Sequence, residues 1–198
     1  MEKQEIVEQL SQIQTSLNEQ KFLPYRYETL NIFGLMVIIS GLLFEPLLEM
    51  NTLYVLYMIV INVVIGLALS IYFTNKESLK YDMEYSLVQK FADRHYGLAS
   101  LLGIVLSYIF IKEGDITYIF PLWLFLIGFA YHAIAYVTNN QIIAKISHFD
   151  IASGFVLMLV AIFFPIEILN SGVKYLSLLF ISGSFFYLAY MSKKQKNV

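Results

Sequence analysis

Three histidines and two aspartates are the residues of this chain whose types and spacing could support chemistry. They form the patterns Asp93-X-His95 and His148-X-Asp150, with His132 between them along the chain. Carboxylate and imidazole groups together bind divalent metals, paired imidazoles ligate haem, and histidine titrates near neutral pH. These five residues are therefore a candidate metal site, haem site or proton switch. The alternative is structural, because aspartate caps helix starts and histidine suits a membrane interface.

A second group of polar residues adjoins or interrupts strongly apolar sequence. Glu45 and Glu167 each follow a charge-free run, and Asn62 lies within another. A carboxylate at the centre of a membrane helix costs about 2.5–3.5 kcal/mol on insertion scales, so its presence needs a reason. We expect either wet positions at the outer membrane boundary or an outward-facing cavity for a ligand or ion, formed by these three residues. Lys174 is the basic residue best placed to pair with the acids.

Several functional classes are disfavoured by what the sequence lacks. There is no cysteine, which excludes disulfides and thiolate metal sites, and HExxH, P-loop and Gly-X-Ser-Gly motifs are missing. The net charge is −2, and the densest basic tract is the tail at 193–196, so nothing favours nucleic acid. We expect no enzymatic activity, no cofactor and no nucleic-acid partner.

The distribution of charge predicts the elements that position these residues. Six runs free of Asp, Glu, Lys and Arg cover residues 29–44, 50–75, 95–111, 116–144, 151–166 and 175–192. Runs that are apolar on every face are typical of helices that cross lipid. The sequence therefore predicts an all-α integral membrane protein with six transmembrane helices. We place the spans at about 29–48, 52–74, 95–112, 116–138, 151–169 and 173–191.

The basic residues predict an orientation. Eleven of the 13 Lys and Arg residues lie in the two termini or in the loops that follow the second and fourth spans. The other two, Lys112 and Lys174, lie in short turns on the opposite side. Because positive charge is retained on the cytoplasmic side, both termini are expected in the cytoplasm of a bacterium, with the spans in its inner membrane.

The order of the charge-free runs predicts three similar helical hairpins. Short runs alternate with longer ones, and the separations Gly41 to Gly66 and Gly103 to Gly128 are both 25 residues. Small residues allow helices to approach closely, so we expect Gly34 and Gly41 to pack within the monomer, with a dimer face as the alternative.

The polar segments are predicted to lie on the cytoplasmic side. Residues 1–22 contain an amphipathic helix whose apolar stripe is Ile6, Leu10, Ile13 and Leu17. Its acidic character disfavours anionic lipid, so this stripe is a candidate contact for a protein partner or a second copy. The transmembrane domain covers 23–192 and a basic tail covers 193–198. The segments 76–94 and 139–149 are expected to form short surface helices.

The layout of six spans resembles that of small HdeD-like acid-resistance membrane proteins and of the substrate-binding subunits of ECF vitamin transporters. The resemblance is one of architecture and carries no residue over. The leading hypothesis is a non-enzymatic membrane component that works through protein contacts of its N-terminal helix. The alternatives are a small transporter or substrate-binding subunit with an outward polar cavity, and a metal- or haem-binding protein.

Overall fold

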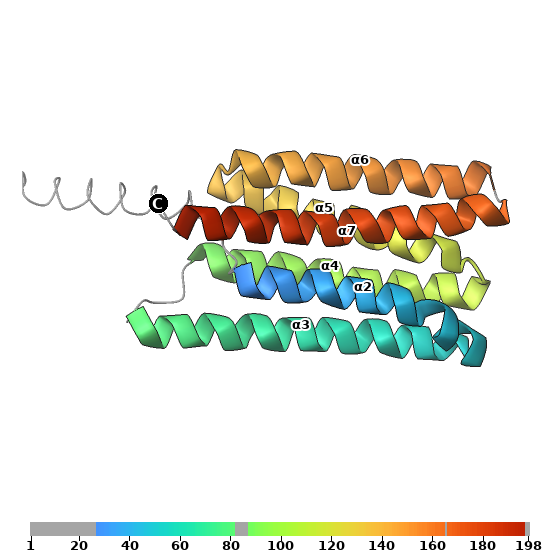
Figure 1. The fold of residues 1–198 in the computed structure, drawn as a ribbon, viewed down its shortest axis with the longest axis horizontal. Helices are drawn as coiled ribbons and strands as arrows, with labels where there is room; N and C mark the ends of the chain where they lie inside the picture. The colour runs from blue at the N-terminus through green and yellow to red at the C-terminus, as the bar shows by residue number, and fades with distance from the viewer. Residues whose placement is uncertain (1–26, 82–86, 165, 197–198) are drawn as a thin grey trace, which may run out of the picture.

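The structure, a computed structural model, describes residues 27–81, 87–164 and 166–196. These residues form helices and their connections and contain no strand. The elements are α2 (Tyr27–Met50), α3 (Thr52–Tyr81), α4 (Leu87–Glu113), the 3₁₀ turn η1 (Ile116–Tyr118), α5 (Ile119–Thr138), α6 (Gln141–Phe163) and α7 (Glu167–Lys196). The six long helices lie side by side, with α3 at one edge of the bundle and α6 at the opposite edge (Figure 1).

All six long helices have the length and apolar composition needed to cross a membrane. Their outward faces carry large apolar side chains, such as Leu42, Leu98 and Phe163, which are mostly exposed. An apolar exterior of this extent is unfavourable in water and favourable in lipid. The prediction of an all-helical chain with six helices able to span a membrane is confirmed, and the fold suggests a multi-pass membrane protein.

Three helices, α4, α6 and α7, begin at least eight residues before the corresponding charge-free runs, and α7 begins at Glu167. α4 begins at Leu87 instead of 95, and α6 begins at Gln141 instead of 151. Asn139 adopts the left-handed conformation that ends α5 (φ 48°), and the Asn140 side chain accepts from the backbone N–H groups of Ile142 and Ile143. A left-handed residue followed by an N-cap makes an abrupt helix boundary. Residues 141–149, which were expected to form a separate surface helix, are thus the first turns of a helix long and apolar enough to span a membrane.

Five helices form a closed ring. α3 contacts α2 and α4, α2 contacts α7, α4 contacts α5, and α5 contacts α7. Across this ring the described backbones stay apart: no Cα of α2 lies within 8 Å of one in α4, and the same holds for α3 and α5. α6 lies outside the ring against α5 and α7. The centre of the ring is therefore a space that only side chains can fill.

The closest helix packing is between α5 and α6, and it depends on two glycines. A Cβ added to Gly128 would lie 2.8 Å from the backbone nitrogen of Ile151, and one added to Gly154 would lie 2.7 Å from that of Phe125. Each glycine thus admits the backbone of the other helix. Gly34 and Gly41 pack within the monomer, as expected, against Phe186 and Leu178 of α7.

Candidate ligand cavity

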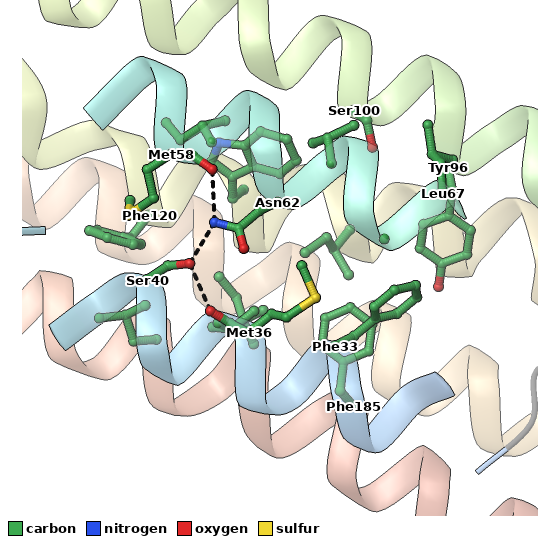
Figure 2. Close-up of a pocket in the computed structure, with 18 of the residues that line it drawn as sticks. Phe33, Met36, Ser40, Met58, Asn62, Leu67, Tyr96, Ser100, Phe120 and Phe185 are labelled. Atoms are coloured by element: carbon green, nitrogen blue, oxygen red, sulfur yellow. Dashed lines mark hydrogen bonds between the residues drawn. The ribbon is translucent and has the colours of Figure 1, made fainter. Parts of the chain in front are cut away.

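A cavity of about 190 Å³ lies within the ring of five helices. An engineered protein cavity of about 150 Å³ binds benzene, so this one can hold a molecule somewhat larger than a single ring. Each of the five ring helices contributes to its lining, and α6 does not. The aromatic part of the lining consists of Phe33, Phe44, Tyr96, Phe120, Trp123 and Phe185 (Figure 2).

A short chain of hydrogen bonds fixes Asn62 on one wall of the cavity. Its Nδ2 donates to Ser40 Oγ at 2.8 Å and to the carbonyl of Met58 at 2.9 Å, and Ser40 donates in turn to the Met36 carbonyl at 2.7 Å. Figure 2 shows the amide oxygen of Asn62 directed away from these two bonds. Both donor hydrogens of the amide are used, so the carbonyl oxygen is the hydrogen-bonding group that Asn62 retains at the cavity wall.

A second polar group lies farther along the cavity, on α3 and α4. Asp93, Tyr96, Ser70 and Ser100 all line it. Ser70 Oγ donates to Asp93 Oδ1 at 3.5 Å. Asp93 lies in the interior of α4, six residues after its start at Leu87, and is therefore not the helix cap that its sequence position suggested. Its carboxylate faces a cavity in the bundle.

Glu45 and Lys174 line a separate hollow near the α2–α3 and α6–α7 connections. This polar hollow of about 400 Å³ is formed by residues of α2, η1 and α7. Lys174 donates to Glu45 Oε1 and is itself 6% exposed, while its ammonium lies 4.4 Å from the ring centroid of Tyr175. Lys174, the basic residue best placed to pair with either acid, is thus in contact with Glu45.

Phe44 lines both the central cavity and the Glu45–Lys174 hollow. Its ring packs on Phe120 with centroids 4.8 Å apart, and the Lys174 ammonium lies 5.7 Å from its ring centroid. Phe44 is thus the side chain that the apolar cavity and the polar hollow share.

Asp150 is buried between α5, α6 and α7, away from the cavity. It lies nine residues after the start of α6 and is 0% exposed; Ser184 of α7 donates to its Oδ1 at 2.7 Å, and no partner is found among the described residues for Oδ2. This position corrects the expectation of a capping role.

The histidines do not assemble with the aspartates into a metal site. His95 Nδ1 donates to the Phe91 carbonyl of its own helix at 2.9 Å, whereas the rings of His132 and His148 lie 5.3 Å apart on the exposed surface of α5 and α6. Across the described part of the chain, no group of three or more His, Asp or Glu residues is placed to hold a metal ion.

Of the two predicted groups, the described residues bring close together only the rings of His132 and His148. Asn62 lines the central cavity and Glu45 the end hollow, while Glu167 begins α7 with a side chain outside the described part. Ile6, Leu10, Ile13 and Leu17 lie outside the described residues. The sequence reasoning did not identify Ser40, Ser70 and Ser100, although serines within charge-free runs are a signal of polar groups facing a bundle interior.

Comparison with known protein families, with curated proteins and with solved structures finds no match for this chain.

Proposed function

We propose that this protein holds a small, largely apolar molecule inside the membrane, as a small transporter or a substrate-binding membrane subunit would. The observation that carries the proposal is the cavity at the centre of the five-helix ring, with a few fixed polar groups in an aromatic lining. Small-molecule sites have this composition, in which apolar surface supplies affinity and sparse polar groups orient the ligand. No catalytic residue is invoked, and the proposal is of a binding protein without enzymatic activity.

The proposed setting is a bacterial inner membrane with both termini in the cytoplasm, which the distribution of basic residues supports. In that orientation the Glu45–Lys174 hollow faces the periplasm and Asp93 lies toward the cytoplasm. The three helical hairpins remain our interpretation of the repeat in the sequence, although the two most extensive helix interfaces, α5–α6 and α2–α7, each join different hairpins. The N-terminal helix remains a proposed contact for a partner or a second copy.

The test is binding of a neutral ring compound, reported by Trp123. This is the single tryptophan of the chain, and it lines the cavity. We expect neopentylbenzene to change its fluorescence saturably in protein purified into lipid nanodiscs. Ser100→Leu, which adds a side chain to the cavity wall, should weaken binding at least about tenfold, a loss of about 1.4 kcal/mol.

Ala68→Leu is the matched control, because Ala68 is exposed on α3 and does not line the cavity. The affinity of Ala68→Leu for neopentylbenzene should equal that of the wild type. If the wild type gives no saturable signal, or if both variants bind as the wild type does, the cavity is not a binding site.

A further inference from the structure

The hydrogen bonds around Asn62 have a fixed direction. A backbone carbonyl only accepts, so the hydroxyl of Ser40 must donate its single proton to the carbonyl of Met36. For the same reason, the amide nitrogen of Asn62 must donate to the carbonyl of Met58. Ser40 Oγ has no further proton to give and therefore accepts the second amide proton. The nitrogen of Asn62 thus faces these partners, and its carbonyl oxygen points away from them (Figure 2).

The carbonyl oxygen of Asn62 has no hydrogen bond among the described residues. The neighbours of Asn62 on the same face of α3 are Ile59, Val63 and Gly66, which also line the cavity and are apolar. A buried water molecule needs two to four polar partners, and this face of α3 offers the Asn62 oxygen alone. The acceptor is therefore suited to a donor carried by a ligand.

Asn62 also lies at the midpoint of the apolar part of its helix. That part covers Thr52–Tyr72, so about ten residues, or about 15 Å of helix, separate Asn62 from either end. The hydrocarbon core of a bilayer is about 30 Å thick, which puts this acceptor at the centre of the proposed membrane. Bulk water and lipid head groups do not reach that depth, and an unpaired polar group there is costly. A ligand that donates to this oxygen removes the cost.

Aromatic side chains lie on both sides of Asn62. Figure 2 shows Phe120 on one side and the pair Phe33 and Phe185 on the other. The rings of Phe33 and Phe185 meet edge to face, with centroids 5.6 Å apart. Aromatic rings prefer such edge-to-face and offset contacts, so a lining of this kind favours a ligand that is itself a ring.

The polar groups farther along the cavity are already engaged by the protein. Ser70, Asp93 and Tyr96 each interact with other protein groups. The hydroxyl of Ser100 can donate as well as accept, so it does not select between ligands that donate and ligands that accept. The Asn62 oxygen can only accept, and it therefore selects a donor.

We propose that the ligand of this cavity is a neutral aromatic molecule with a hydroxyl or N–H donor on its ring. The donor bonds to Asn62 Oδ1, and the ring packs against Phe33, Phe185 and Phe120. This inference rests on the proposed function and specifies its ligand class.

The experiment compares 4-propylphenol with 4-propyltoluene, in which a methyl group replaces the hydroxyl. The two compounds have nearly the same shape and differ in one hydrogen-bond donor. Each is titrated against Trp123 fluorescence in nanodiscs, and its concentration in the lipid is corrected by its partition into empty nanodiscs. The wild type should bind the phenol about fivefold more tightly, the effect of one neutral hydrogen bond. Asn62→Leu keeps the size of the side chain and removes the acceptor, so the preference should fall below about twofold.

Val63→Ala is the matched control, since Val63 lines the cavity next to Asn62 and has no polar group. This variant changes the fit of both compounds alike and should keep the fivefold preference. Equal wild-type affinity, or a preference for 4-propyltoluene, would overturn the ligand class and leave the proposed function standing. Binding of neither compound would overturn the proposed function itself.

A preference that survives Asn62→Leu, or that Val63→Ala removes as well, would overturn the role of Asn62. Asn62→Ala is the second variant, because it removes the same carbonyl with the residue most favourable to a helix, and it decides this point if Asn62→Leu does not fold. The wild-type comparison needs no variant.

Discussion

At the scale of single residues, the two buried carboxylates show what the sequence could not predict. The charge-free runs predict Asp93 and Asp150 at helix starts, because an acidic residue next to an apolar run is typical of the edge of a membrane span. Both lie inside helices, and Asp150 is fully buried against Ser184. Its partner is 34 residues away on another helix. Such a partner depends on tertiary packing, which no local pattern reports.

The ion pair of Glu45 with Lys174 was predictable, because few basic residues were available on that side. Lys174 is 6% exposed, whereas the Glu45 side chain is 54% exposed. Glu45→Gln should therefore lower the free energy of unfolding by about 1–3 kcal/mol, because it leaves a buried ammonium without its counter-charge. The double variant with Lys174→Met should be more stable than Glu45→Gln alone. Thermal unfolding in detergent measures both.

Glu49→Gln is the control for this pair, since Glu49 is an exposed acid near the same end of α2. Its unfolding should match that of the wild type. The interpretation is wrong if Glu45→Gln costs no more than Glu49→Gln, or if the double variant is the least stable of the set.

At the scale of elements, helix existence was predictable and helix starts were less so. All six spans follow from apolar runs too long for ordinary surface helices. The starts of α4 and α6 were set too late because charged residues near them were assigned to loops. The pair Asn139–Asn140 carried the missing signal, a left-handed residue followed by an N-cap. The capping residues therefore mark the boundary between α5 and α6 more accurately than hydropathy does.

The α5–α6 interface yields a prediction about glycine. Gly128→Ala should lower the free energy of unfolding by about 1–3 kcal/mol, because the added methyl group would meet the backbone of α6, which cannot move as a side chain can. Gly183→Ala is the matched change on α7, where an added Cβ meets nothing within 4 Å, and it should be neutral or slightly stabilising. Thermal unfolding measures both variants. An equal loss of stability in Gly128→Ala and Gly183→Ala would contradict this account of the interface.

At the scale of the whole molecule, the arrangement of the helices was beyond the reach of the sequence. Hairpin reasoning pairs neighbours along the chain, yet α2 packs extensively on α7, at the other end of the described chain. In the most apolar 18-residue stretch of each helix, 67% of the residues are buried in α5, whereas only 17–33% are buried in α2, α3, α4 and α6. A helix that contacts lipid and a helix at the centre of the bundle both need apolar side chains. Hydropathy therefore cannot distinguish a central helix from a peripheral one. The cavity depends on this arrangement and could not be foreseen.

The cavity also sets an expectation for overall stability. An empty space forfeits dispersion contacts along its walls, so filling it should stabilise the folded protein. Ser100→Leu should raise the free energy of unfolding by about 1 kcal/mol, although it is expected to weaken binding. Ala68→Leu, on the exposed face of α3, should leave stability unchanged. A loss of stability in Ser100→Leu alone would mean that the cavity walls cannot accommodate the larger side chain.

The central cavity has a volumetric consequence as well. A volume of 190 Å³ per molecule corresponds to about 110 mL per mole, slightly more than the roughly 20–100 mL/mol by which unfolding contracts proteins. Hydrostatic pressure favours the state of smaller volume, so the empty protein is the form most sensitive to compression. A molecule that fits the cavity removes that volume difference. The resistance of the folded state to pressure should therefore increase with the fraction of the cavity that is filled.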